Sequence, residues 1–193
     1  MKQLEDWLKS SKPKTIAGLI DASGQKSFAL IFLVLMAIPA TPLPTGGITH
    51  VFETIVLLLA LEMVAGRRTI WLPKKWLHRP LGKTLEKRTL PYLLRKISWF
   101  EKHSHPRWRG LLGDRQFLRL VGLLVIIFTL GAFFSPPFSG LDTLPSMGVV
   151  GIALGLILED FAIWLLGVII GAAGIVVSIG FGEIIIAAIK RLF

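Results

Sequence analysis

Residues 28–47 read FALIFLVLMAIPATPLPTGG, an apolar run that stops at a segment rich in proline and glycine. The eleven residues from Phe28 to Ile38 are too few for a straight transmembrane helix, which needs about 20. Proline removes a backbone donor and clashes with the preceding turn, so a helix cannot continue through this segment. Apolar sequence resumes at residues 48–65. We predict a broken helical hairpin, whose break is either a loop outside the membrane or a re-entrant turn at membrane depth.

Lysine and arginine are absent from two long windows of the chain. None occurs from Ser27 to Gly66 or from Val121 to Ile189. A soluble domain would need charged side chains in both windows, whereas a bilayer core excludes them. The mean hydropathy of +0.67 and the 18% of charged residues agree with the second setting. We therefore predict an all-α, polytopic integral membrane protein.

The positive charge is concentrated between the two windows. Fifteen of the 22 Lys and Arg residues lie from Arg67 to Arg119, and the others precede Ser27 or stand at Lys190 and Arg191. Short segments rich in Lys and Arg stay in the cytosol. We therefore expect both termini and residues 67–116 to be cytosolic, so that each window leaves this side and returns to it.

The second window repeats the outline of the first. At an offset of 97 residues, Pro39 aligns with Pro136 and Glu62 with Glu159. This predicts two related halves, each with a Pro/Gly-broken hairpin that is either re-entrant or closed by a loop outside the membrane, as in transporters with a site near the midplane. The orientation of the halves, parallel or inverted, stays open. The predicted breaks are Pro39, Pro42, Pro44, Gly46, Gly47, Pro136 and Pro137.

Four segments follow from this organisation. Residues 1–26 are expected to form cytosolic or interfacial helices, and residues 27–66 the first membrane hairpin. Residues 67–116 form a basic amphipathic cytosolic segment. Residues 117–193 form the second membrane half, with an additional C-terminal spanning segment.

Carboxylates in or beside apolar sequence supply the candidate site. A charge at the bilayer centre costs from about 3 to more than 10 kcal/mol, so such groups persist where they are paired, hydrated or functional. His50 and Glu53 share one helix face and could relay protons or bind a cation. Alternatively, both are solvated at the surface, and the other acids mark helix ends. The candidates are His50, Glu53, Glu62, Glu159 and Asp160.

The middle segment interleaves cations with tryptophan. This mixture is typical of an amphipathic helix on anionic lipid headgroups. Nucleic-acid binding is the weaker alternative, because adjoining membrane spans explain the aromatic residues as an interface belt. The expected lipid-facing cations are Arg67, Arg68, Lys87, Arg88, Arg95 and Lys96.

Enzyme templates are missing from the sequence. The chain has no cysteine, no Gly-x-Ser-x-Gly, no Walker sequence and no His-Glu-x-x-His, and no thiol or acid completes a metal set with His103 and His105. We expect no catalytic residue, no metal and no cofactor, although a membrane enzyme acting on lipid-linked sugars is a third alternative.

Two motifs resemble the ExoD family of bacterial inner-membrane proteins. They are residues 38–47, IPATPLPTGG, followed by residues 61–73, LEMVAGRRTIWLP, and the weaker residues 155–160, GLILED. The resemblance covers roughly residues 10–185. Two positions depart from the family pattern, where glutamine is expected at Glu62 and arginine at Glu159. The resemblance implies an inner-membrane location and a role in exopolysaccharide production, and it carries over no catalytic residue.

These observations together predict a transporter-like or transport-accessory protein of exopolysaccharide synthesis or export. A proton- or cation-coupled site would lie between the two Pro-broken repeats. The alternative is a non-transporting scaffold that holds anionic lipid or a cytosolic partner through its basic middle segment. The exopolysaccharide machinery and a second copy of the chain are the expected protein partners.

Overall fold

The structure, a computed structural model, describes residues 2–42, 48–103, 114–136 and 139–192. This part of the chain is helical and holds no strand, which confirms the all-α prediction. The helices are α1 (Lys2–Lys9), α2 (Ile16–Ser23), η1 (Gly24–Lys26), α3 (Ser27–Met36), α4 (Ile48–Val64), α5 (Lys74–Leu77), η2 (Leu85–Thr89), α6 (Leu90–His103), α7 (Arg115–Phe133), α8 (Thr143–Leu158) and α9 (Phe161–Leu192).

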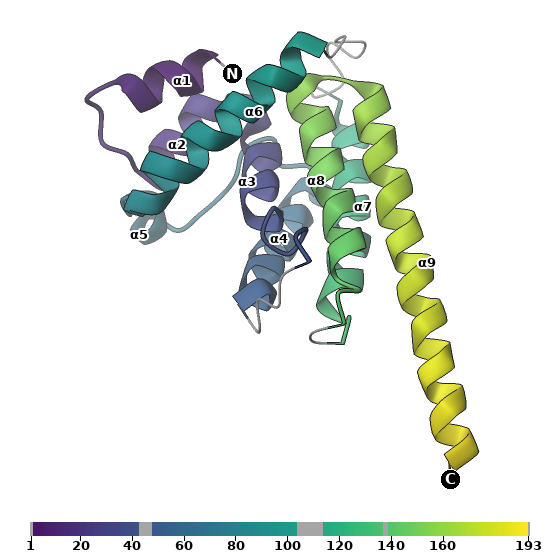
Figure 1. The fold of residues 1–193 in the computed structure, drawn as a ribbon. Helices are drawn as coiled ribbons and strands as arrows, with labels where there is room; N and C mark the ends of the chain where they lie inside the picture. Colours follow the sequence, from purple (N-terminus) through teal and green to yellow (C-terminus); the bar gives the residue numbers. More distant parts are fainter. Residues whose placement is uncertain (1, 43–47, 104–113, 137–138, 193) are drawn as a thin grey trace.

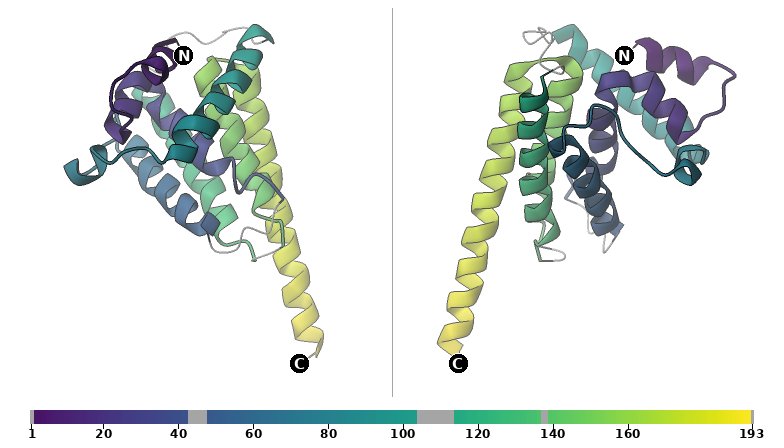
Figure 2. Two further views of the ribbon diagram at one scale, coloured as in Figure 1. Left: turned by 60° about the vertical axis from the view of Figure 1, so that its left-hand side comes forward. Right: turned by 180° about the vertical axis from the view of Figure 1, so that it is seen from behind.

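Helices α3, α4, α7 and α8 stand side by side as a bundle, and α9 lies along α8 (Figures 1 and 2). The short helices α1, α2, α5 and α6 gather at one end of this bundle, which we call the basic end because the cation-rich segment lies there. The connections that follow α3 and α7 lie at the opposite end, which we call the distal end. The bundle therefore consists of two hairpins, α3–α4 and α7–α8, whose bends point the same way.

The proline segments end the helices as predicted, but each break is a connection at the distal end (Figure 1). Pro39 lies in a turn after α3, Pro42 follows it outside helix, and Pro136 lies outside helix after α7. Pro44, Gly46, Gly47 and Pro137 fall outside the described residues. The described breaks therefore join two helices and do not interrupt a single one, so a re-entrant turn and a duplication stay predictions from the sequence.

Three helical segments among the described residues are long and apolar enough to cross a membrane. They are Ile16–Met36, Arg115–Phe133 and Phe161–Phe181. Large apolar side chains on the outer faces of α4, α7 and α9 are exposed, including Leu58, Leu123 and Ile169. Contiguous apolar surface of this kind is rare on soluble monomers. The fold therefore fits a membrane protein.

Close backbone contact joins α8 to α9. A Cβ added to Gly151 would lie 2.6 Å from the Cα of Gly167, and one added to Gly148 would lie 2.4 Å from the Cα of Gly171. Only glycine allows this approach, which gains dispersion energy and weak backbone contacts in membranes. The glycines of α8 and α9 thus fix the second hairpin against the last helix.

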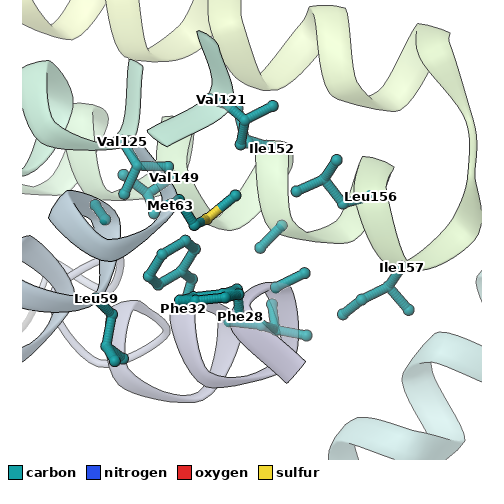
Figure 3. Close-up of a cluster of buried hydrophobic side chains, with 14 of the residues drawn as sticks. Phe28, Phe32, Leu59, Met63, Val121, Val125, Val149, Ile152, Leu156 and Ile157 are labelled. Carbon is teal, nitrogen blue, oxygen red and sulfur yellow. The ribbon is translucent and has the colours of Figure 1, made fainter. Parts of the chain in front are cut away.

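The bundle is closed near the basic end by apolar side chains (Figure 3). Figure 3 shows them converging from α3, α4, α7 and α8, and we call this group the apolar core. It contains Phe28, Phe32, Leu59, Met63, Val121, Val125, Val149, Ile152, Leu156 and Ile157. These apolar side chains fill the space between the four helices, as the dense packing of protein interiors requires.

The two ends of the chain lie at opposite ends of the molecule (Figure 1). Helix α1 lies at the basic end, whereas α9 runs past the distal end. A membrane crossed by α9 would separate the termini, which differs from our expectation that both are cytosolic. For the C-terminus the expectation rested on Lys190 and Arg191, and two cations are a weaker orientation signal than the fifteen of the middle segment.

Candidate functional site

Glu53 is a fully buried carboxylate, with 0% of its side chain exposed, inside the bundle. It lies in the second turn of α4, and its Oε2 is 2.9 Å from Nδ1 of His50, one turn earlier. Its Oε1 has no hydrogen-bond partner among the described residues. A buried charge with an open oxygen is costly and calls for a proton or a cation.

His50 connects this carboxylate with the distal end of the bundle. Its side chain is 38% exposed, and its ring lies 5.0 Å from the ring of Phe133, the last residue of α7. The imidazole therefore reaches the surface while one of its nitrogens contacts Glu53. An imidazole with one exposed nitrogen can pass a proton to a buried acid, because the two ring nitrogens are separate sites.

Two buried hydroxyls face the same region from the second hairpin. Thr129 of α7 and Ser146 of α8 are both 0% exposed, and their Oγ atoms have no hydrogen-bond partner among the described residues. Thr49 of α4 is buried as well. Hydroxyls buried in a helical bundle normally find a partner.

The register of the helices puts Glu53 and Thr129 at one level. Helices α4 and α7 run antiparallel, with Phe133 beside His50 and Gly122 packed on Ala60. Glu53 is three residues from His50 and Thr129 is four residues from Phe133, so each is about one turn from that contact. The two side chains therefore lie at the same height in the bundle.

Ser146 lies at nearly the same level. A Cβ on Gly131 would lie 3.9 Å from the Cβ of Pro145, which places the start of α8 beside the end of α7. Ser146 is next to Pro145, and Thr129 is two residues from Gly131. We refer to Glu53, Thr129 and Ser146 as the polar cluster.

A further carboxylate lies near the polar cluster in sequence. Asp142 directly precedes α8, and His50 contacts Glu53 toward the distal end. A second negative charge nearby raises the cost of an unneutralised Glu53. The arrangement favours positive species at the distal end.

The structure does not bring the other predicted site residues to this cluster. Glu62 lies nine residues further along α4, about 13 Å nearer the basic end. Its Oε2 accepts a hydrogen bond of 2.8 Å from the amide of Trp71. The cation of Arg67 stacks on the Trp71 ring at 5.2 Å. Glu62 therefore holds the segment that follows α4 through its hydrogen bond to Trp71.

Glu159 and Asp160 form the turn between α8 and α9, also at the basic end. Glu159 ends α8 in the left-handed region, at φ 55°, and it pairs with Nζ of Lys26 at 2.9 Å. Lys26 also donates to the carbonyl of Ile157 at 2.7 Å. Asp160 accepts from the amide of Ala162 at 2.9 Å, as an N-cap of α9. Both acids thus serve helix ends here.

Comparison with known proteins adds one finding to this geometry. The model of the ExoD family, described as exopolysaccharide synthesis, matches residues 1–180. The chain belongs to the ExoD family. It is 27% identical over 199 residues to an uncharacterized protein, slr1875, of Synechocystis sp., and the match covers 100% of this chain and 88% of that protein. No solved structure matches. Membership in the ExoD family implies a role in exopolysaccharide synthesis and agrees with the three apolar helices.

The basic segment of this ExoD-family protein has the predicted amphipathic form. Helix α6 buries Leu90, Leu94 and Ile97 and exposes Arg95 and Lys96. Exposed aromatic side chains accompany the cations, since Lys96 lies 5.7 Å from the ring of Tyr92. Exposed cations of the same end also include Arg67, Arg68, Lys87 and Arg88.

Sequence reasoning missed three residues around these sites. Thr129 and Ser146 carry no charge, so nothing marked them within long apolar runs, although the repeat pairs Ser146 with Thr49 at the offset of 97 residues. The sequence marks Lys26 only as the last cation before the first cation-free window. No group of three or more His, Cys, Asp or Glu side chains suited to a metal occurs in the part of the ExoD-family chain that the structure describes.

Proposed function

We propose that this ExoD-family protein is a transporter-like protein of the bacterial inner membrane that acts in exopolysaccharide synthesis or export. Its proton- or cation-coupled site is the pair His50–Glu53. The basic end faces the cytosol, because its exposed cations are retained there, and the distal end faces the periplasm. The predicted duplication of the two hairpins supports a transporter-like design.

One observation carries the proposal, the complete burial of Glu53. An acid on a helix end would be expected to reach solvent, as Glu62 does on the same helix. Glu53 instead has one oxygen on His50 and one without a partner among the described residues. Burial of that kind destabilises the fold unless the group is neutralised, and neutralisation by a mobile proton or cation is what a coupled site requires.

The access to Glu53 supports the same proposal. The half-exposed His50 links Glu53 to the distal end, whereas the apolar core residues of α4, Leu59 and Met63, follow Glu53 toward the basic end. A site that is reached from one side and closed on the other matches one state of an alternating-access cycle. We infer that the described state is open toward the periplasm.

The test uses purified full-length protein in liposomes loaded with a pH-sensitive dye. An imposed pH gradient should drive proton flux above that of empty liposomes, and Glu53→Gln should return the flux to the empty level. Glu62→Gln is the matched control, because it removes a charge from the same helix at a solvent-facing position, and its flux should equal that of wild type. Equal flux in empty and protein-containing liposomes, or full flux in the Glu53 variant, would contradict the proposal.

A second candidate function rests on the exposed cations and aromatics of the basic end. Arg67 stacks on Trp71 and Arg79 on Trp76, both at 5.2 Å, and these rings are exposed. Such pairs suit a membrane surface with anionic headgroups. As a scaffold, the protein would lose its effect on cellular exopolysaccharide when Arg95 and Lys96 are both changed to Glu, and keep it in Glu53→Gln. The transporter-like proposal predicts that Glu53→Gln alone abolishes the effect.

A further inference from the structure

We propose that the polar cluster is a binding site for a small monovalent cation, Na⁺, with the carboxylate of Glu53 and the hydroxyls of Thr129 and Ser146 as its ligands. The inference deepens the proposed function and rests on it for the role of the ion in coupling. Its structural basis is independent, because it comes from three oxygens that the function proposal does not need together.

Three buried side-chain oxygens lie at one level of the bundle. Oε1 of Glu53, Oγ1 of Thr129 and Oγ of Ser146 are buried without a hydrogen-bond partner among the described residues. Each such group lowers the stability of the fold if it stays unpaired. Three at one height in the bundle indicate that one species satisfies them together.

The three oxygens come from three different helices. Helices α4, α7 and α8 each contribute one oxygen. The register argued above puts all three within about one helical turn, or about 5 Å, along the bundle. Oxygens that converge from separate helices can surround an ion, whereas a single helix can present ligands on one side only.

The charge and the chemistry of the three ligands favour a hard, monovalent cation. A carboxylate and two hydroxyls form a set of hard oxygen ligands without sulfur, which favours hard cations over transition metals. One carboxylate balances one positive charge, so a monovalent ion fits better than Ca²⁺ or Mg²⁺, which recruit more carboxylates. A water molecule would satisfy hydrogen bonds but leave the carboxylate charge unpaired in an apolar setting.

His50 occupies the opposite carboxylate oxygen, Oε2, at 2.9 Å. This leaves Oε1 for the ion, while the contact with the imidazole fixes the orientation of the carboxylate. The ion would enter past His50, because the apolar core closes the other direction. Asp142 adds a negative charge on this route, which attracts cations toward it.

The experiment measures the thermal stability of the purified full-length protein in detergent as NaCl replaces choline chloride at constant ionic strength. Wild type should be stabilised by Na⁺ in a saturable way, because an ion that binds the folded state raises its melting temperature. K⁺ should act at least about tenfold more weakly, a preference worth about 1.4 kcal/mol. Binding of radioactive Na⁺ to the same sample gives a direct second readout.

Thr129→Val and Ser146→Ala remove one ligand oxygen each at nearly constant volume. Each should raise the Na⁺ concentration for half-saturation at least about tenfold, which corresponds to about 1.4 kcal/mol, because one ligand oxygen is lost. The matched control is Thr54→Val on α4, whose hydroxyl is already bonded to the carbonyl of His50 at 2.7 Å. Its response to Na⁺ should equal that of wild type.

The outcomes separate this inference from the function proposal. Equal stability in Na⁺, K⁺ and choline, or an unchanged Na⁺ response in both hydroxyl variants, overturns the sodium site, while flux that depends on Glu53 would still support the function. Saturable Na⁺ binding that both hydroxyl variants weaken supports the site. If such a sample shows neither proton flux nor Na⁺ flux in liposomes, the function proposal fails and the site stands.

Discussion

The two hairpins α3–α4 and α7–α8 have the same layout and different chemistry. Each bends at the distal end after a proline-bearing segment, and each has a buried hydroxyl near the start of its second helix, Thr49 or Ser146. The first hairpin holds the ionisable pair His50 and Glu53. The second offers only hydroxyls at that height. The two hairpins therefore bend at the same end of the bundle but carry different polar residues.

The hairpins also end differently at the basic end. Helix α4 passes through Gly66 (φ 84°) into the basic segment, where Glu62 accepts from the Trp71 amide. Helix α8 turns at once into α9 through Glu159, which Lys26 holds. The second hairpin thus packs on α9 through facing glycines, whereas the first meets α7 where Gly122 lies against Ala60 and Met63. We interpret the second hairpin as the rigid frame and the first as the element that carries the site.

The largest expected effect tests the rigid frame. Gly151→Leu forces a side chain into the space where a Cβ would already lie 2.6 Å from the Cα of Gly167. We expect the helices to separate and folded protein to be lost from membranes, as judged by size-exclusion chromatography in detergent. Gly82→Leu is the control, since a Cβ there meets nothing within 4 Å. A Gly151 variant that behaves like wild type would end the interpretation of the second hairpin as a tightly packed frame.

A smaller effect is expected from the first hairpin. Met63→Ala opens a cavity in the apolar core, where Met63 is 1% exposed. We expect a loss of about 2–5 kcal/mol in the free energy of unfolding, seen as a lower melting temperature. Leu61→Ala, on the outer face of the same helix with 54% exposure, should cost less than about 1 kcal/mol. Similar losses in both variants would show that this face of α4 does not pack as described.

The smallest effect is expected from the contact between the hairpins at the basic end. Lys26→Met removes the ion pair with Glu159 and the hydrogen bond to the carbonyl of Ile157. Because both side chains are partly exposed, we expect a loss of only about 1 kcal/mol, smaller still at high salt. The control is Lys83→Met at an exposed position. A Lys26 variant with wild-type melting at low salt would show that this contact does not hold the hairpins together.

Several elements were predictable because they depend on local sequence. The end of α3 follows from the prolines after Met36, and the break between α8 and α9 follows from Glu159 and Asp160 within apolar sequence. The buried face of α6 follows from the spacing of Leu90, Leu94 and Ile97, and the opposite face is therefore exposed. By contrast, the position of the α9 end opposite the basic end did not follow from Lys190 and Arg191.

The sequence by itself determined that the chain is helical, that its apolar windows suit a bilayer and that it belongs with ExoD proteins, because hydropathy, proline breaks and motifs are properties of neighbouring residues. Only the tertiary structure decided which acid is buried. Glu53 and Glu62 lie on one helix beside similar apolar residues, yet Glu53 is fully buried at the level of Thr129 and Ser146, while Glu62 accepts a hydrogen bond from the Trp71 amide. Burial depends on helices more than 70 residues away in the chain, and no local pattern encodes that contact.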